Sequence, residues 1–114
     1  MQYMLLIYST EGDGPDDPAV LERYRAFGEE VREAGKFVAG GRLRPTSTAS
    51  SVRVRDGELT VTDGPFAETK EHLGGYYLLD CDDLDEAIAY ARKIPAAERG
   101  SIEVRPIWEV PVRA

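Results

Sequence analysis

The order strand, helix, strand occurs twice along this chain, and a hairpin pattern separates the two copies. Short apolar runs rich in strand-forming residues predict the strands, and apolar residues at helical spacing predict the helices. The strands are expected at residues 2–8, 36–43, 76–79 and 102–107, and the helices at residues 18–34 and from Asp83 onward. Two such units, with both helices on one face of a four-stranded antiparallel sheet, predict an α+β, ferredoxin-like βαββαβ domain with an inserted β-hairpin.

Local signals support these boundaries. Asp17 followed by Pro18 is typical of a helix N-cap and first turn, and Gly35 is typical of a helix C-cap. Asp83, three residues before a glutamate, predicts a capping box for the second helix. Asp56-Gly57 lies between two alternating segments and predicts a β-hairpin turn. Gly40-Gly41, inside an expected strand, indicates a bulge or a close backbone neighbour.

The two central strands carry consecutive apolar residues, in the segments MLLIY and YYLLD. A sheet face exposed to water normally reads polar at every second position, so both faces of these strands are expected to be covered. Helices cover one face of a ferredoxin-like sheet, and a second copy of the chain is expected to cover the other. The sequence therefore predicts a homodimer joined through its sheet face, with the hairpin at residues 52–62 reaching toward the partner.

Composition narrows the classes of partner and location. The net charge is -7 at neutral pH, and the longest basic cluster is Arg42-Leu43-Arg44, which argues against nucleic-acid binding. No run of about 18 apolar residues is present, and the N-terminal segment MQYMLLIYST lacks a signal-peptide pattern. With one cysteine, Cys81, and 114 residues, we expect a single cytoplasmic domain over residues 1–114 without membrane contact.

The segment TDGPFAETKE at residues 62–71 differs from the chain around it. Asp63, Gly64 and Pro65 are turn-forming residues, and Phe66 is expected to anchor the turn by burying its ring, worth about 1.5–3 kcal/mol. This interpretation, a structural corner, accounts for residues 63–66. A structural corner does not require the charged residues that follow at positions 68–71, so the segment is also a candidate functional site.

The same segment also resembles the signature sequence of a known protein family. Residues 63–71, DGPFAETKE, resemble the signature of the YCII-related superfamily, in the subgroup of DGPF-domain proteins, and the flanking segments MLLIY, GGYY and VRP agree with it. The resemblance implies a dimeric α/β-barrel fold and no established activity for most members. It also implies genes that lie beside extracytoplasmic-function sigma factors. Sister proteins carry a histidine–aspartate pair in a cleft, but residues 18–34 here contain no histidine.

The chemistry expected near this segment is acid–base and anion binding. If residues 68–72 are extended, Glu68, Lys70 and His72 share one face beside Phe66, which would suit a small polar or anionic ligand. Arg42 or Lys70 would then hold the anionic group. His72 is the single imidazole, and either His72 or Asp63 is the candidate proton carrier, although a lone exposed histidine specifies no mechanism.

Other chemistry is less well supported. Acidic neighbours are expected to raise the pKa of Cys81, which argues against a nucleophilic thiolate. The histidine and cysteine content does not provide a zinc site, and neither a metal nor another cofactor is expected. Two functions remain open, beside a third alternative, a scaffold that has neither. One is a small-molecule cleft near the DGPF loop, with or without cofactor-free catalysis. The other is a regulatory module that binds a partner protein such as a sigma factor.

Overall fold

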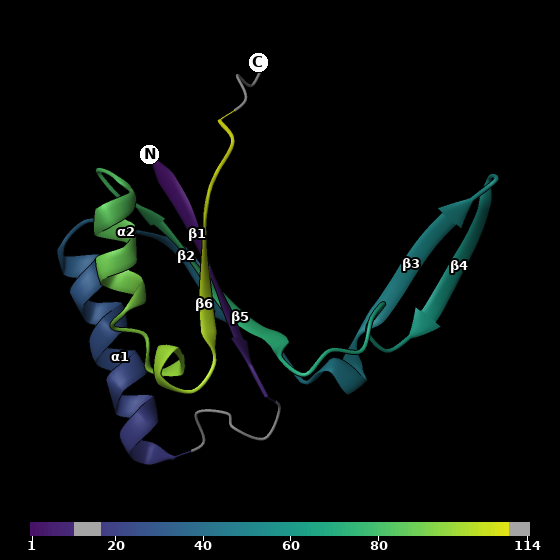
Figure 1. Ribbon diagram of the computed structural model, residues 1–114, viewed down its shortest axis with the longest axis horizontal. Coiled ribbons are helices and arrows are strands. Elements are labelled where there is room, and N and C mark those ends of the chain that lie inside the picture. The colour runs from purple at the N-terminus through teal and green to yellow at the C-terminus, as the bar shows by residue number, and fades with distance from the viewer. Residues whose placement is uncertain (11–16, 110–114) are drawn as a thin grey trace.

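A computed structural model describes residues 1–10 and 17–109 (Figure 1). Its elements follow the predicted order closely. They are β1 Gln2–Ser9, α1 Pro18–Glu33, β2 Phe37–Arg42, β3 Ser50–Arg55, β4 Glu58–Asp63, β5 His72–Asp80, α2 Leu84–Ala91 and β6 Ser101–Pro106, with 3-10 turns at Thr46–Thr48 and Pro95–Glu98. The largest difference in boundary is in β5, which begins at His72 and includes Gly74-Gly75, whereas the sequence predicted a strand from Tyr76 onward.

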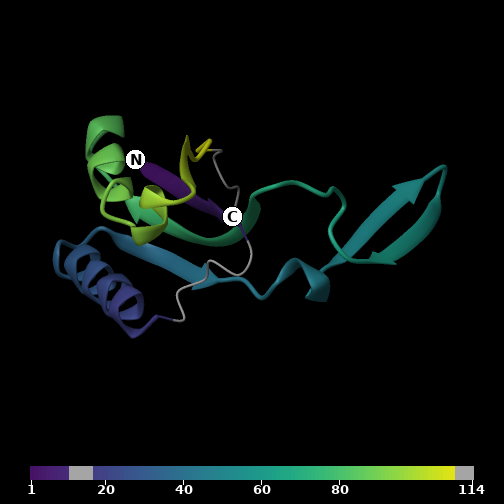
Figure 2. The ribbon, with the colours of Figure 1, turned by 60° about the horizontal axis from the view of Figure 1, so that its bottom comes forward.

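The main sheet has the strand order β2-β5-β1-β6, and every neighbouring pair is antiparallel. Both helices lie on one side of this sheet (Figures 1 and 2). Each helix connects two strands that are not adjacent, so the two strand–helix–strand units interleave. The fold is α+β and ferredoxin-like, with β3 and β4 inserted between the units, as predicted.

A side-chain cap fixes where α1 begins, and a backbone motif fixes where it ends. The Asp17 carboxylate accepts a 2.9 Å hydrogen bond from the Ala19 N–H, and Pro18 occupies the first helical position, where no N–H is needed. At the other end Gly35 has φ +72°, and the N–H groups of Gly35 and Lys36 donate to the carbonyls of Arg32 and Val31. This is a Schellman motif, and it turns the chain directly into β2.

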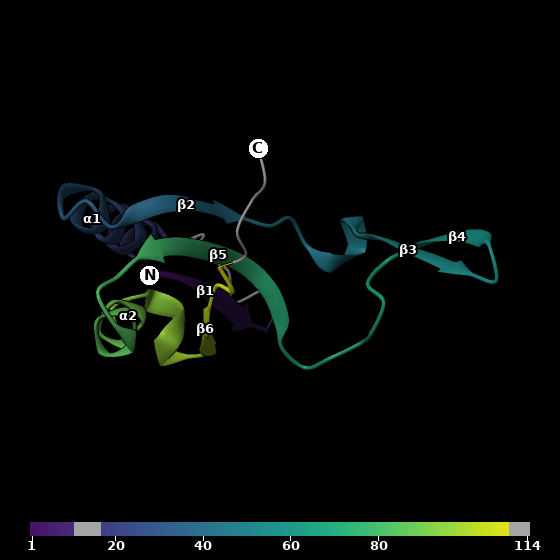
Figure 3. The ribbon, with the colours of Figure 1, turned by 90° about the horizontal axis from the view of Figure 1, so that it is seen from above.

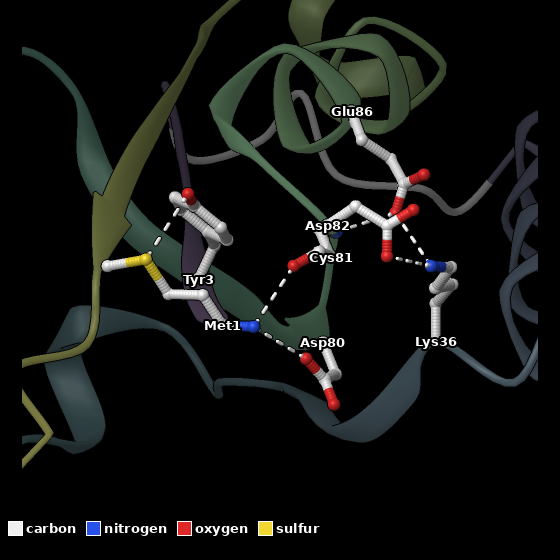
Figure 4. A network of polar contacts seen from close by, with 7 residues as sticks. All are labelled: Met1, Tyr3, Lys36, Asp80, Cys81, Asp82 and Glu86. Carbon is white, nitrogen blue, oxygen red and sulfur yellow. Dashed lines mark hydrogen bonds and ion pairs between the residues drawn. The ribbon is translucent and has the colours of Figure 1, made fainter.

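The start of α2 carries a variant of the predicted capping box, in which the glutamate accepts from the residue before the N-cap. The Asp83 carboxylate accepts from the Glu86 N–H at 2.9 Å, and Glu86 Oε1 accepts from the Asp82 N–H at 3.1 Å. Lys36, just before β2, reaches the same cluster: its Nζ lies 2.9 Å from Glu86 Oε1 and 3.2 Å from Asp82 Oδ1 (Figure 4). These contacts join the start of α2 to the edge strand of the sheet.

The core lies between the helices and the sheet. The alternation of β1 and β5 turns every second side chain toward the helices, where apolar burial stabilises the fold. The buried apolar side chains are Tyr3, Leu5, Ile7, Phe27, Val31, Leu79, Cys81, Ala87, Ala91 and Ile94. Within this core the Phe27 ring packs edge-on against Tyr77, with 5.0 Å between ring centroids.

The opposite face of the sheet has no helix over it. Because Tyr3, Leu5 and Ile7 face the core, the intervening Met4, Leu6 and Tyr8 face the other way. Their partners across the ladder include Leu78, opposite Met4, and Tyr76, opposite Leu6. These side chains are half-buried within the single chain. We refer to Met4, Leu6, Tyr8, Tyr76 and Leu78 as the apolar strip.

The inserted hairpin forms a separate two-stranded sheet that projects away from the body of the molecule (Figures 1 and 3). Asp56 and Gly57 have φ values of 51° and 78°. Positive φ at both central residues defines a type I′ turn, whose twist matches that of the flanking strands. The predicted Asp-Gly hairpin is confirmed, and we refer to residues 50–63 as the arm.

Candidate small-molecule pocket

A pocket of about 590 Å³ opens between α1 and one end of the main sheet. Its walls come from α1, the ends of β1 and β2, the start of β5 and the turn Pro95–Glu98. This volume is within the range of about 300–1,000 Å³ that is usual for small-molecule sites.

Arginine is the charged residue that dominates the described lining of this pocket. The five are Arg23, Arg32, Arg42, Arg44 and Arg99, against two described carboxylates, Asp17 and Glu98. Both carboxylates already have partners, since Asp17 caps α1 and Glu98 forms a 2.8 Å ion pair with Arg23.

The arginines differ in their own contacts. The Arg32 guanidinium lies over the Phe37 ring, 4.2 Å from its centroid. By contrast, the side chains of Arg44 and Arg99 form no hydrogen bond or ion pair with any residue in the described ranges. Cationic donors that line a pocket and have no acceptor among the described residues can serve a bound anion.

Two of the residues that line the pocket, Tyr24 and Tyr77, carry phenol hydroxyl groups. Burial is the main cause that raises the pKa of Tyr24 and of Tyr77. For Tyr24, a hydrogen bond with the Ala96 backbone and the nearby Arg42 and Arg23 charges partly offset it. Both phenols therefore stay protonated at neutral pH and are able to donate hydrogen bonds.

Glycines keep the end of the sheet open. Gly40, Gly41, Gly74 and Gly75 all line the pocket, so no side chain from these positions fills it. Close packing also requires some of them: a Cβ on Gly75 would lie 2.8 Å from the Gly41 carbonyl oxygen, and one on Gly40 would lie 3.0 Å from Tyr77 Cδ1. The predicted close backbone neighbour at Gly40-Gly41 is confirmed. The register shift in β2 lies slightly earlier, between Phe37 and Ala39.

Of the site residues predicted from sequence, His72 and Arg42 line this pocket. His72 is the first residue of β5 and pairs with Ser9, while Arg42 is the last residue of β2. Antiparallel pairing of β2 with β5 brings the C-terminal end of β2 and the N-terminal end of β5 to the same end of the sheet.

The other predicted site residues, Asp63, Phe66, Glu68 and Lys70, do not line the pocket. Residues 68–71 form no strand, so the condition under which Glu68, Lys70 and His72 were expected to share one strand face is not met. The ligand-binding and catalytic roles of the four residues stay predictions.

The DGPF corner itself is tied to the base of the arm. Gly64 has φ +99°, its N–H donates to the Ala49 carbonyl at 2.7 Å, and its own carbonyl accepts from Ser51 Oγ at 2.8 Å. The Phe66 ring, however, is 81% exposed. The expectation that Phe66 anchors this corner by burial is wrong within one chain, because no element among residues 1–10 and 17–109 covers the ring.

Sequence reasoning missed most of the arginine lining. Arg42 was predicted to hold an anionic group, but the other four arginines that line the pocket were not predicted as site residues; they are Arg23, Arg32, Arg44 and Arg99. Of the two adjacent tyrosines of β5, Tyr77 is on the helix side of the sheet and lines the pocket, whereas Tyr76 lies in the apolar strip.

Cys81 lies in the core, away from this pocket. Burial raises the pKa of its thiol, with Glu86, Asp80 and Asp82 adding to the effect and Lys36 opposing it. The raised pKa confirms the prediction, although burial and not the acidic neighbours is the leading cause. Within residues 1–10 and 17–109, no three His, Cys, Asp or Glu side chains are grouped so that they could hold a metal ion.

The fold and pocket define an α+β domain of the ferredoxin-like class with a site at one end of its sheet. The chain belongs to the family of the YCII-related domain, whose model matches residues 1–111. An uncharacterized protein of Rhizobium meliloti (strain 1021) is 43% identical over 114 residues, covering 94% of this chain and 92% of that protein. The predicted YCII resemblance is confirmed, and membership of the DGPF subgroup stays a prediction.

A solved structure also resembles this chain. It is 5-chloro-2-hydroxyhydroquinone dehydrochlorinase from Burkholderia phenoliruptrix AC1100, in complex with 2,5-dihydroxybenzoquinone. The TM-score is 0.48 at 14% sequence identity, covering 96% of this chain and 94% of that one. Among the described residues, neither helix combines the length and apolar character that a membrane crossing requires.

Proposed function

We propose that this protein binds a small organic anion in the pocket between α1 and the sheet. The observation that supports this most directly is the group of five arginines that line a cavity in a chain of net charge -7. In an acidic protein, a local excess of cations at a concave surface is unlike the rest of the surface and attracts an anion.

The chemistry of the lining favours a carboxylate or phosphate attached to an organic body. A guanidinium presents two parallel N–H donors that match the two oxygens of a carboxylate or phosphate group. Ile7, Val20, Leu21 and Phe37 supply apolar wall for the remainder of the ligand, and Tyr24 and Tyr77 supply hydroxyl donors. His72 is the residue at this pocket to test for proton transfer, because an imidazole can exchange a proton near neutral pH.

The first experiment is isothermal titration calorimetry with aliphatic carboxylates, aromatic carboxylates and phosphate monoesters. Arg44→Gln and Arg99→Gln should each weaken binding of the strongest ligand by about tenfold, which corresponds to roughly 1.4 kcal/mol for one lost charged hydrogen bond. Arg53→Gln is the matched control, since Arg53 lies on the arm and does not line the pocket. Unchanged affinity in both pocket variants would reject this site.

The alternative site near the DGPF loop is tested in the same series. Lys70→Ala should leave the affinity unchanged if the anion binds in the arginine-lined pocket. A loss confined to Lys70→Ala would move the site to the loop, as the sequence alone suggested. If no ligand of the panel binds at millimolar concentration, the anion proposal fails, and the alternative of a module that binds a partner protein gains support.

A further inference from the structure

The arginines of the pocket lie at two separate positions along α1 and β2. α1 runs beside β2, which is an edge strand of the main sheet (Figures 2 and 3). Arg32, near the end of α1, places its guanidinium over Phe37, the first residue of β2. Arg42 is the last residue of β2, and Arg44 follows two residues later. An extended strand separates the Cα atoms of Phe37 and Arg42 by roughly 15 Å. We refer to these two parts of the pocket as the Arg32 end and the Arg42 end.

Strand pairing turns Arg42 toward the helices. Tyr77 packs on Phe27 of α1 and therefore faces the helices, and Gly40 is its partner in β2. Side chains alternate along a strand, so Arg42, two residues after Gly40, faces the helices as well. The partner of Arg42 in β5 is Gly75. Because Gly40 and Gly75 both line the pocket and carry no side chain, neither position divides the pocket between its two ends.

The two pocket tyrosines lie near different arginines. Burial, the largest effect, raises the pKa of both phenols, and nearby arginine charges oppose it. The opposing charge at Tyr77 is that of Arg32. The opposing charges at Tyr24 are those of Arg42 and Arg23. Since water and salt screen charges over short distances, Tyr77 lies toward the Arg32 end and Tyr24 toward the Arg42 end.

Gly28 makes room for the guanidinium at the Arg32 end. Glycine inside a helix is disfavoured relative to alanine, yet Gly28 lies in the interior of α1. A Cβ on Gly28 would lie 2.8 Å from Arg32 Nη1, so the guanidinium occupies the space that the missing side chain leaves. Among residues 1–10 and 17–109, no hydrogen bond or ion pair engages the Arg32 side chain. Contact with Phe37 therefore positions the guanidinium while its N–H donors remain available to an anion.

We propose that the ligand of this pocket carries two anionic groups on an apolar body, one bound at the Arg32 end and the other at the Arg42 end. This inference rests on the proposed function, because it specifies which organic anions the pocket binds. A single carboxylate would satisfy one end and leave the cation at the other end without an anion. Dicarboxylates are the simplest molecules of this class, and acids that combine a carboxylate with a phosphate group also belong to it.

Isothermal titration calorimetry with monocarboxylates and dicarboxylates of equal chain length tests this proposal. The dicarboxylates run from succinate to sebacate. The best of them should bind at least about tenfold more tightly than its monocarboxylate, because a second charged contact is made. Affinity should pass through a maximum along the series, since the two ends are a fixed distance apart. Equal affinities of the paired acids at every length would overturn the inference and leave anion binding intact. If no acid of either kind binds, the proposed function fails too.

Two variants of α1 locate the second anionic group. Arg32→Gln removes the charge at the Arg32 end and should abolish the advantage of the dicarboxylate. Gly28→Ala keeps every charge but displaces the guanidinium, so it should reduce the same advantage without weakening the helix. Arg25→Gln is the matched control, since Arg25 forms ion pairs within α1 and does not line the pocket. A dicarboxylate advantage that survives Arg32→Gln would place both anionic groups at the Arg42 end and overturn the proposal.

Discussion

At the scale of single residues, backbone conformation at the DGPF corner limits what can replace Gly64. Its φ of +99° lies in a region that L residues with a side chain rarely adopt, and no atom lies within 4 Å of an added Cβ. A substitution there is therefore opposed by backbone strain and not by crowding. The hydrogen bonds that Gly64 exchanges with Ala49 and Ser51 hold this conformation in place.

We predict that Gly64→Val lowers stability by more than about 1 kcal/mol, because a β-branched residue at this φ is strained. The measurement is thermal unfolding followed by circular dichroism. Gly64→Ala and Gly74→Ala add the same methyl group, and Gly74 has neither a positive φ nor a neighbour closer than 3.9 Å to its added Cβ. Only the Gly64 variant should melt earlier. Equal melting temperatures for the two alanine variants would show that the corner is not strained.

At the scale of elements, a charged cluster joins the edge strand to the second helix. Lys36 forms ion pairs with Glu86 and Asp82 at the point where β2 and α2 both begin (Figure 4). The Lys36 hydrogen bond is the main cause that lowers the pKa of Glu86, and the Glu86 and Asp82 hydrogen bonds raise the pKa of Lys36.

These directions fix the pH range in which the cluster stabilises the fold. Since the pKa of Glu86 is depressed, its contribution is complete above the ordinary carboxyl value of 4.5 and is lost as pH falls through the lower folded value. Since the pKa of Lys36 is raised, its contribution is complete below 10.5 and is lost as pH rises through the higher folded value. The stabilising effect is therefore constant between these two limits.

We predict that Glu86→Gln lowers the urea midpoint at pH 7 and that its difference from the wild type disappears as pH falls below 4.5. The amide oxygen of glutamine still accepts from the Asp82 N–H, so the variant removes charge and keeps the helix cap. Glu58→Gln, at an arm carboxylate without an ion pair to any described residue, is the control and should not change the midpoint. A Glu86→Gln deficit that persists at pH 3 would contradict an ionic origin.

The helices and strands could be predicted because caps and turns depend on residues close together in the sequence. The pocket could not be predicted because it depends on contacts between distant segments. Asp17, Gly35 and Asp56-Gly57 each act within a few residues, so their caps and turn can be inferred without the fold. Pairing between β2 and β5 brings Arg42 and His72 to the same end of the sheet. No local sequence pattern specifies this pairing. The early start of β5 has a similar cause, because close approach to Gly41 favours Gly75 within a strand although glycine is a weak strand former.

At the scale of the whole molecule, the reactivity of the Cys81 thiol measures how readily the core opens. Its side chain is buried among residues from both helices and the central strands, and burial raises the pKa of its thiol. Both properties suppress the thiolate that reacts with electrophiles, so reaction requires opening of the core.

We predict that a thiol reagent such as 5,5′-dithiobis(2-nitrobenzoate) labels Cys81 slowly at pH 7.5, and that urea accelerates the reaction in parallel with loss of circular dichroism. The chain with Thr60→Cys provides an exposed reference thiol on the arm, which should react at least a hundredfold faster. Comparable rates for the two thiols in native buffer would mean that the core opens locally around Cys81.

The central position of β1 has a consequence for synthesis on the ribosome. β1 is made well before both of its neighbours, which are β5 and β6, and β6 ends at Pro106. Until those strands emerge, the nascent chain carries an apolar strand whose hydrogen-bonding edges are both unpaired. Such a strand can associate with other chains, and its late pairing over a long sequence separation slows folding. The same segment that is best protected in the finished protein is therefore the one that most needs shielding by chaperones while the chain is incomplete.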